Sequence, residues 1–208
     1  MTFTIKNVFM PDETMTDKSR EAINYILKVI AEGIPEAFTY HTIGHTTGVL
    51  SVAEKLGKSE NVDPRSLELL CVAAAWHDCG YLSGSSRHEE EGCHTARRIL
   101  PDYGFHAGEI DEICNLIMAT KIPTNPGTLL QKIICDADLH YLGTDRYEFF
   151  AGLLFTELLN FGQIKTGEEW IEKQISFLSA HRFFTETAIR LYDNQKWINL
   201  DKLKNNRK

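Results

Sequence analysis

The sequence predicts an all-α protein built as one compact helical bundle. Apolar residues recur at steps of three and four in nearly every segment, which is the period of an amphipathic helix, and the two-residue alternation of strands is almost absent. Glycine and proline interrupt these segments at intervals that suit helices. The chain has 208 residues, of which 43% are hydrophobic and 25% charged, so it can bury one sizeable core. We therefore expect a single domain over residues 1–208.

The first three predicted helices stop at glycines. Glycine favours a helix end because it readily adopts the left-handed conformation that closes the last turn. Before the third helix, aspartate followed by proline is a typical N-terminal signal, since aspartate caps the helix and proline fits its first turn. The expected ranges are about Asp17–Glu32, His41–Leu56 and, after Asp63-Pro64, a stretch that ends near Gly80.

Six further helices are expected in the rest of the chain. Prolines and glycines between the apolar segments separate them. No linker, repeat or low-complexity segment divides this part of the sequence. The expected ranges are about His88–Leu100, Ala107–Ala119, Leu129–Leu142, Tyr147–Phe161, Glu168–His181 and Phe184–Trp197.

The charge balance is acidic, with a formal net charge of -7. It favours a soluble protein and offers no basic surface for a nucleic-acid polymer or an anionic membrane. No leader pattern and no membrane-spanning apolar stretch is evident, and the five cysteines form no CxxC pair, so we expect a cytoplasmic protein with reduced, buried thiols. Aromatic residues at helical spacing in the second half favour a core or a homodimer interface.

Two histidines four residues apart head an apolar stripe in the segment YHTIGH. On the second predicted helix His41 and His45 would share one face, which continues as Val49, Val52 and Leu56. A core histidine with one hydrogen bond is the usual explanation for one such residue. Two on the same face favour a shared partner instead.

His77 and Asp78 follow the most apolar run of the chain, Leu69–Ala74. A buried carboxylate needs a counter-charge or several hydrogen-bond donors. A bound cation would satisfy this pair together with the two histidines of YHTIGH. Such a cation would explain why an imidazole and a carboxylate stand side by side at the end of a core helix.

The segment IICDADL places two more carboxylates in an apolar context. Asp136 and Asp138 are about 200° apart on a helix, so they cannot both face one site. We expect Asp138 to point inward, on a face with Ile134 and Leu142, and Asp136 to lie behind the site or on the surface. The alternative for a single aspartate here is a hydrogen bond between packed helices.

Taken together, the candidate ligands are two imidazoles and two carboxylates from three helices: His45, His77, Asp78 and Asp138. A mixed set of nitrogen and oxygen ligands suits Zn, Mn, Fe, Co or Ni and does not choose among them.

This order of His, His-Asp and Asp resembles the HD-domain superfamily of metal-dependent phosphohydrolases. YHTIGHTTGVL is similar to the YHNxxHxxxV stretch of the branch that includes the cyclic-nucleotide phosphodiesterases, AAAWHDCGY to the HD helix, and DADLHYLG to the last ligand segment. Thr42 stands where the phosphodiesterase pattern has Asn, a departure that leaves the metal ligands intact. The resemblance spans about Tyr40–Gly143. It implies an HD-like core over about 38–145, additional helices over 146–200 and a short basic tail over 201–208.

The resemblance also implies roles for individual residues. His45, His77, Asp78 and Asp138 match the metal ligands, and Asp78 would bridge to a second ion such as Mg. His41 matches the histidine that protonates the leaving oxygen in the phosphodiesterase branch. Chemistry agrees, because a metal-bound hydroxide can attack phosphorus while a nearby imidazole acts as general acid. Asp78 and His41 are thus the expected catalytic residues.

Further candidates lie in and after the segment SSRHEEEGCHTARRIL. His88-Glu89 loosely matches a histidine or His-Glu that many superfamily members carry after the HD pair, so we treat both as substrate or second-metal candidates. Glu89 is equally explained as part of a solvated helix N-terminus. Arg87, Lys121 and Arg146 are in turn either phosphate ligands or ordinary surface charges.

Three functions are compatible with these residues. The leading hypothesis is a metal-dependent phosphohydrolase, a phosphomonoesterase or phosphodiesterase, that acts on a small phosphate ester or nucleotide. The alternatives are a regulatory HD domain that binds a nucleotide without turnover and a di-iron oxygenase. The oxygenase needs additional histidine ligands, and only His88 and His94 are available for it.

Overall fold

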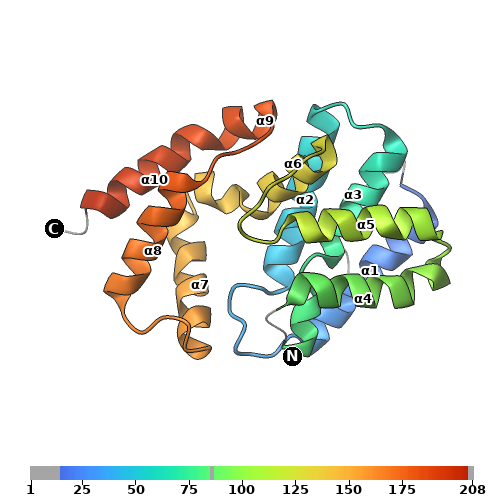
Figure 1. The fold of residues 1–208 in the computed structure, drawn as a ribbon, viewed down its shortest axis with the longest axis horizontal. Coiled ribbons are helices and arrows are strands. Elements are labelled where there is room, and N and C mark those ends of the chain that lie inside the picture. Colours follow the sequence, from blue (N-terminus) through green and yellow to red (C-terminus); the bar gives the residue numbers. More distant parts are fainter. Residues whose placement is uncertain (1–14, 85–86, 206–208) are drawn as a thin grey trace.

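The computed structural model describes residues 15–84 and 87–205, and within these ranges the chain forms helices and loops without a strand (Figure 1). The all-α prediction is confirmed. The longer helices are α1 (Asp17–Gly33), α2 (Ile43–Ser59), α3 (Pro64–Trp76), α4 (His88–Ile99), α5 (Ala107–Ala119), α6 (Leu129–Asp138), α7 (Tyr147–Asn160), α8 (Gly167–Ala180) and α10 (Asn194–Asn205). Between them lie the short elements η1 (Cys79–Ser83), η2 (Leu100–Tyr103), η3 (His140–Gly143), α9 (Glu186–Ala188) and η4 (Ile189–Asp193).

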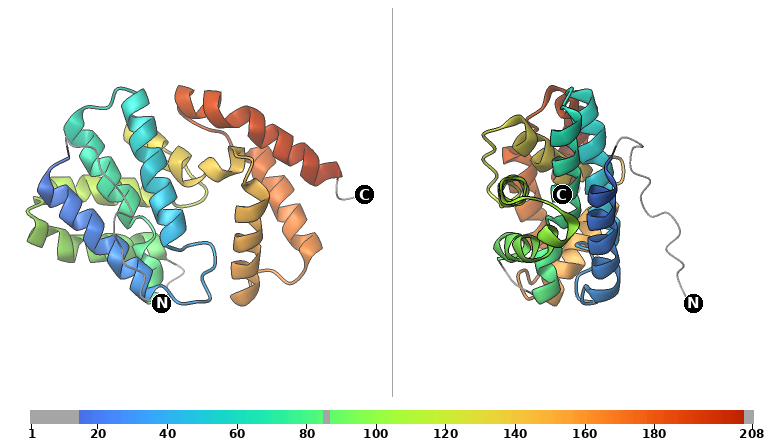
Figure 2. Two further views of the ribbon diagram at one scale, coloured as in Figure 1. Left: turned by 180° about the vertical axis from the view of Figure 1, so that it is seen from behind. Right: turned by 90° about the vertical axis from the view of Figure 1, so that its right-hand side faces the viewer.

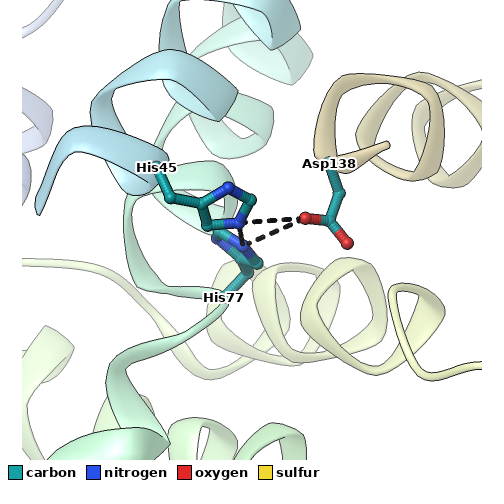
Figure 3. A group of neighbouring side chains, drawn as sticks. All are labelled: His45, His77 and Asp138. Carbon is teal, nitrogen blue, oxygen red and sulfur yellow. Dashed lines mark hydrogen bonds and ion pairs between the residues drawn. The ribbon is translucent and has the colours of Figure 1, made fainter. Parts of the chain in front are cut away.

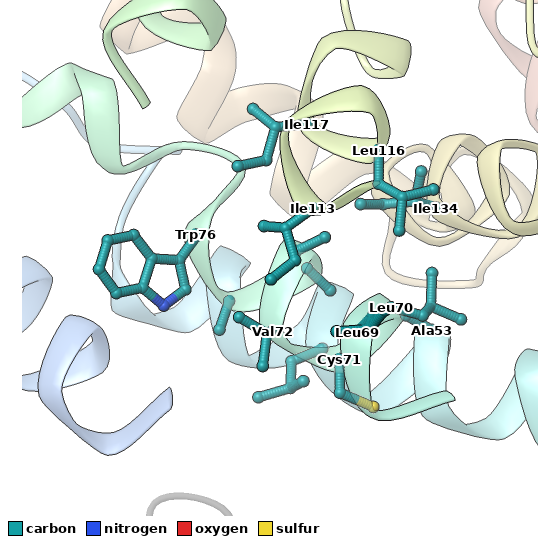
Figure 4. Close-up of a cluster of buried hydrophobic side chains, with 14 of the residues drawn as sticks. Ala53, Leu69, Leu70, Cys71, Val72, Trp76, Ile113, Leu116, Ile117 and Ile134 are labelled. Atoms are coloured by element: carbon teal, nitrogen blue, oxygen red, sulfur yellow. The ribbon is translucent and has the colours of Figure 1, made fainter. Parts of the chain in front are cut away.

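Helix α3 is the centre of the larger hydrophobic core. It packs against α1, α2, α5 and α6, and every residue from Leu69 to Trp76 is buried. A helix that is apolar all round must be surrounded by other helices, and this one is (Figure 4). Its start is fixed by Asp63, whose carboxylate accepts hydrogen bonds from the N–H groups of Arg65 and Ser66 as the sequence predicts.

Helices α7, α8 and α10 form a second group beside the first, whereas Ala188 of the short α9 packs in the larger core. Figures 1 and 2 show α7, α8 and α10 on one side of the molecule and α1 to α5 on the other, with α6 and η3 leading from one group to the other. A smaller hydrophobic cluster holds the second group together and includes Tyr141, Tyr147, Leu178 and Leu200. None of the described helices has the length and apolarity that crossing a membrane requires.

Several predicted helix boundaries are wrong. Helices α1 and α2 include Gly33 and Gly57 instead of stopping before them, and α3 ends at Trp76 instead of near Gly80. Helix α2 begins at Ile43 with Thr42 as its N-terminal cap, so His41 lies outside it. Helix α6 ends at Asp138 and is followed by the 3-10 turn η3 instead of continuing to Leu142. The predicted last helix is interrupted by the π-helical segment η4, and α10 then continues to Asn205, into the stretch expected as a tail.

Candidate metal centre and active site

Two histidines approach each other from the ends of α2 and α3 (Figure 3). His77 caps the C-terminus of α3, and its Nδ1 lies 2.8 Å from the carbonyl oxygen of Ala74. Because a carbonyl can only accept, Nδ1 carries the proton and the Nε2 lone pair faces the site. His45, in the first turn of α2, places its Nε2 3.3 Å from the Nε2 of His77.

Two carboxylates lie next to these nitrogens. Oδ2 of Asp78 is 3.0 Å from His77 Nε2 and 3.2 Å from His45 Nε2. Oδ1 of Asp138, at the C-terminal end of α6, is 3.1 Å from His45 Nε2 and 3.5 Å from His77 Nε2. The four predicted ligands therefore meet in one place, although α6 follows α2 and α3 only after two further helices.

This cluster fits a divalent cation. Oδ2 of Asp78 is buried, and its only close polar neighbours among the described residues are the two ring nitrogens. Burial lowers the pKa of His45 and His77, but contacts with the two carboxylates outweigh it and raise both pKa values. For Asp78 and Asp138 burial acts in the other direction and raises the pKa. The nearby imidazoles outweigh burial and hold both pKa values well below the usual range. The pocket favours a shared positive charge, which a metal ion with nitrogen and oxygen ligands would supply.

His41 belongs to the same site but is held differently from the prediction. It precedes α2, so it does not share a helical face with His45; the two ring centroids are nevertheless 5.6 Å apart. Its Nδ1 pairs closely with Oε1 of Glu157. Oε2 of Glu157 accepts hydrogen bonds from the backbone N–H groups of Tyr40 and His41 at 2.8 and 3.0 Å. These hydrogen bonds place Nδ1 of His41 beside the carboxylate of Glu157. Nε2 is therefore the ring nitrogen that can contact a ligand.

Glu157 is the functional residue that sequence reasoning missed. It is buried in α7, 3% exposed, and lies 116 positions after His41 in the chain. Burial raises the pKa of Glu157, but the hydrogen bond from His41 and the two backbone donors outweigh it and lower the pKa. Its segment, FTELLN, reads as an ordinary amphipathic helix, so no local signal identifies it.

His88 approaches the other oxygen of Asp78. Its Nε2 is 3.5 Å from Asp78 Oδ1 and 3.5 Å from Glu89 Oε1. The ring of Tyr81 stacks on His88 with a centroid distance of 4.0 Å. A Cβ on Gly80 would lie 2.0 Å from the carbonyl oxygen of His88, so only glycine lets α4 begin this close to Asp78.

The other residues predicted to contact the substrate or a second metal do not lie together. Glu89 is buried, so the interpretation as a solvated helix N-terminus is wrong for this residue. Lys121 lines the cavity described below and pairs with Glu90. Arg87 is exposed at the start of α4, while Arg146 lies over the aromatic rings at the start of α7.

Asp136 was expected behind the site or on the surface. The structure excludes the surface, because Asp136 is 0% exposed. Its carboxylate accepts three hydrogen bonds of 2.8 Å, from the N–H of Phe184 and from the N–H and Oγ1 of Thr185. These donors explain how a buried carboxylate is tolerated here without a cation.

A cavity of about 710 Å³ opens beside the four candidate ligands. Its first wall carries the polar groups of the larger helical group, including His41, Asp78, His88 and Asp138. Its second wall comes from α7 and α8 and is mostly apolar, with one buried amide; among its residues are Leu154, Leu158, Trp170, Gln174 and Phe177. The cavity has the size of a site for a small organic ligand.

Comparison with known proteins agrees with this geometry. Residues 42–140 match the family model of the HD domain, a range that contains the four candidate ligands but neither His41 nor Glu157. A crystal structure of a predicted HD superfamily hydrolase from an uncultured Thermotogales bacterium has a TM-score of 0.60 and 23% identity, over 89% of each chain. The structure of Bacillus subtilis YpgQ in complex with ADP has a TM-score of 0.62 and 16% identity, over 90% of this chain and 94% of that one. At these identities the two structures show a common fold. No curated relative matches the chain.

Proposed function

This chain belongs to the HD-domain superfamily, and from that premise we propose that it is a metal-dependent phosphohydrolase acting on a small phosphate ester or nucleotide. The observation that carries the proposal is the buried Oδ2 of Asp78, which lies 3.0 and 3.2 Å from two imidazole nitrogens and has no other polar partner among the described residues. His45, His77, Asp78 and Asp138 would hold the ion. A divalent metal in such a site polarises a phosphoryl oxygen and lowers the pKa of water toward neutrality.

His41 is the proposed general acid. The close pair with Glu157 holds its ring through Nδ1, so Nε2 is free to give a proton to the leaving oxygen of a substrate in the cavity. Glu157 is a positioning residue in this scheme, because it touches His41 and its backbone but does not line the cavity. His88 and Lys121 are in position to contact phosphate oxygens on the same side.

The second wall of the cavity supports an organic substrate larger than inorganic phosphate. Trp170 and Phe177 offer flat apolar faces, and Gln174 offers an amide that is 7% exposed. Oε1 of Gln174 accepts a hydrogen bond from the Tyr147 hydroxyl, which leaves its amino group for a ligand. A nucleobase has both the flat face and the polar edge that this wall would bind. Among the structural neighbours, YpgQ was solved with ADP, which makes a nucleotide the first substrate class to test.

The metal is tested by elemental analysis of protein purified without added metal. We expect near-stoichiometric Zn, Mn, Fe, Co or Ni in the wild type. Asp78→Asn should weaken metal affinity by at least about 100-fold, because a direct ligand matters more than its outer-shell partners. Asp111→Asn is the matched control, since Asp111 is exposed and pairs with Arg97 on the surface. A wild type that contains no metal and regains none on dialysis would contradict the proposal.

Turnover is tested on a panel of phosphomonoesters, phosphodiesters and nucleotides with Mn, Co, Ni or Mg. Hydrolysis that depends on the metal and on His41 supports the proposed enzyme. Nucleotide binding by metal-loaded protein without any turnover would instead support the regulatory alternative. The oxygenase alternative is less favoured, because it needs additional histidine ligands and His94, one of the two available, is exposed on α4.

A further inference from the structure

The segment that carries Asp138 is anchored on both sides by the C-terminal helices. Asp136, two residues before Asp138, is bonded to Phe184 and Thr185 in the loop after α8. On the other side, Nδ2 of Asn199 in α10 donates to the carbonyl oxygens of Leu142 and Thr144, at 3.0 and 2.9 Å. We call these two sets of hydrogen bonds the polar clamp.

Both centres of the polar clamp are buried. Asp136 is 0% and Asn199 4% exposed, and Gln195 in turn donates to the Asn199 side-chain oxygen at 2.9 Å, which fixes the orientation of its amide. Close backbone packing accompanies the second anchor, because a Cβ on Gly143 would lie 2.3 Å from the carbonyl oxygen of Tyr192. Water cannot replace such bonds, so the clamp leaves the segment few alternative positions.

Of the four candidate ligands, Asp138 depends most on the polar clamp for its position. His45 lies in the first turn of α2 and His77 caps α3; these helices pack against each other and against α6 in the larger core. Asp138 is the last residue of α6, at the point where the helix gives way to η3, and its side chain is 17% exposed against 5% and 1% for the two histidines. Its carboxylate reaches His45 only if the end of α6 is held in place.

We propose that Asp136 and Asn199 are positioning residues for the metal site, through which α10 and the loop before α9 hold Asp138 against His45 and His77. This inference rests on the proposed metal site and extends it beyond residues 42–140, the range of the HD-domain match. It makes the C-terminal helices part of the metal centre, although none of their side chains is a candidate ligand.

The test is a titration of the full-length, metal-free protein with Co²⁺, followed by its visible absorption, for the variants Asp136→Asn and Asn199→Ala. Asp136→Asn replaces one accepting oxygen by an amide N–H₂, which cannot accept from the donors of Phe184 and Thr185. Asn199→Ala removes the hydrogen bonds to Leu142 and Thr144 and leaves those of Asp136 in place. We expect each variant to bind Co²⁺ about tenfold more weakly than the wild type, the lower end of the loss seen when the supports of metal ligands are removed. Asn199→Ala keeps the test open if Asp136→Asn does not fold.

Glu68→Gln is the matched control. Glu68 accepts hydrogen bonds from the N–H and Oγ1 of Thr16 and from Oγ of Ser19, so it tethers the start of α1 to α3, about 14 Å along the helix from His77. We expect a lower melting temperature for Glu68→Gln without a change in Co²⁺ affinity. If both clamp variants also melt earlier but keep the wild-type Co²⁺ affinity, the clamp is merely structural and the inference is wrong. If the wild type itself binds no Co²⁺, the metal site fails and the clamp fails with it.

Discussion

The two walls of the cavity differ in how they are built. In the wall from the larger helical group, polar residues stand at helix ends beside buried apolar runs, as Asp78 does after α3 and Asp138 does at the end of α6. In the wall from α7 and α8, the lining side chains lie along helix faces at ordinary amphipathic spacing, as Trp170, Gln174 and Phe177 do. The first arrangement leaves a local trace in the sequence, whereas the second depends on how one helical group is docked against the other.

The two regions meet at His41. Its chain position belongs to the larger group, but its ring and backbone are held by Glu157 from α7. If the second group only supplies a surface to the cavity, a change at Glu157 should not alter the rate of the chemical step.

The largest effect is expected for this pair. His41→Ala should lower kcat by about 10² to 10⁴-fold, the range for loss of a general acid, with little change in metal content. Glu157→Gln should lower kcat less, by about tenfold, because the ring remains but its support is weakened. The double variant should be no worse than His41→Ala, since a positioning residue acts only through its partner. Steady-state kinetics on the best substrate of the panel would check all three.

Glu148→Gln serves as the control, because Glu148 lies exposed on the same helix. Wild-type kcat in Glu157→Gln, or strictly additive losses in the double variant, would show that the second group contributes no more than a surface to the cavity.

The two walls of the cavity also differ in how well they can be predicted from the sequence. His45, His77, Asp78 and Asp138 follow from helical periodicity plus one motif, because each stands next to residues that must be buried. For Asp136 the sequence left two places open, because a helical wheel shows that it faces away from Asp138 but not that three donors from residues 184–185 cover that face. Glu157 could not be predicted at all, since its partner lies 116 residues away and nothing in FTELLN marks it. The fold class was predictable because periodicity is local, whereas the docking of α7 to α10 is a property of tertiary contacts.

The second group should also be the more acid-sensitive region. His181 is buried there, and neither of its ring nitrogens is hydrogen-bonded to any residue in 15–84 or 87–205. Burial and the positive charges of Lys196 and Arg182 lower the pKa of His181 to about 4, against the opposing effect of Asp193. In the unfolded chain the pKa is about 6.5, so between these values the unfolded state binds more protons. The contribution of neutral His181 to stability is therefore fully present above about pH 6.5 and is lost as the pH falls toward 4, by at most about 3 kcal/mol.

Urea unfolding at a series of pH values would measure this effect. We expect His181→Leu to lose less stability, or to gain more, than the wild type between pH 6.5 and 4. His94→Gln is a suitable control because that imidazole is exposed. Equal acid sensitivity in wild type and His181→Leu would place the responsible groups elsewhere and remove this contrast between the two regions.

The smallest effect expected tests whether the second wall selects the substrate. Gln174→Leu keeps the volume of the side chain but removes the amino group that we propose for the base of a nucleotide. The ratio of kcat/KM for a nucleotide to kcat/KM for ribose 5-phosphate should fall by about tenfold, which corresponds to about 1.4 kcal/mol, or one hydrogen bond. Gln163→Leu, an exposed glutamine in the loop after α7, should leave this ratio unchanged. An unchanged ratio in Gln174→Leu would mean that the wall only excludes water, and that recognition lies with the groups around the metal site.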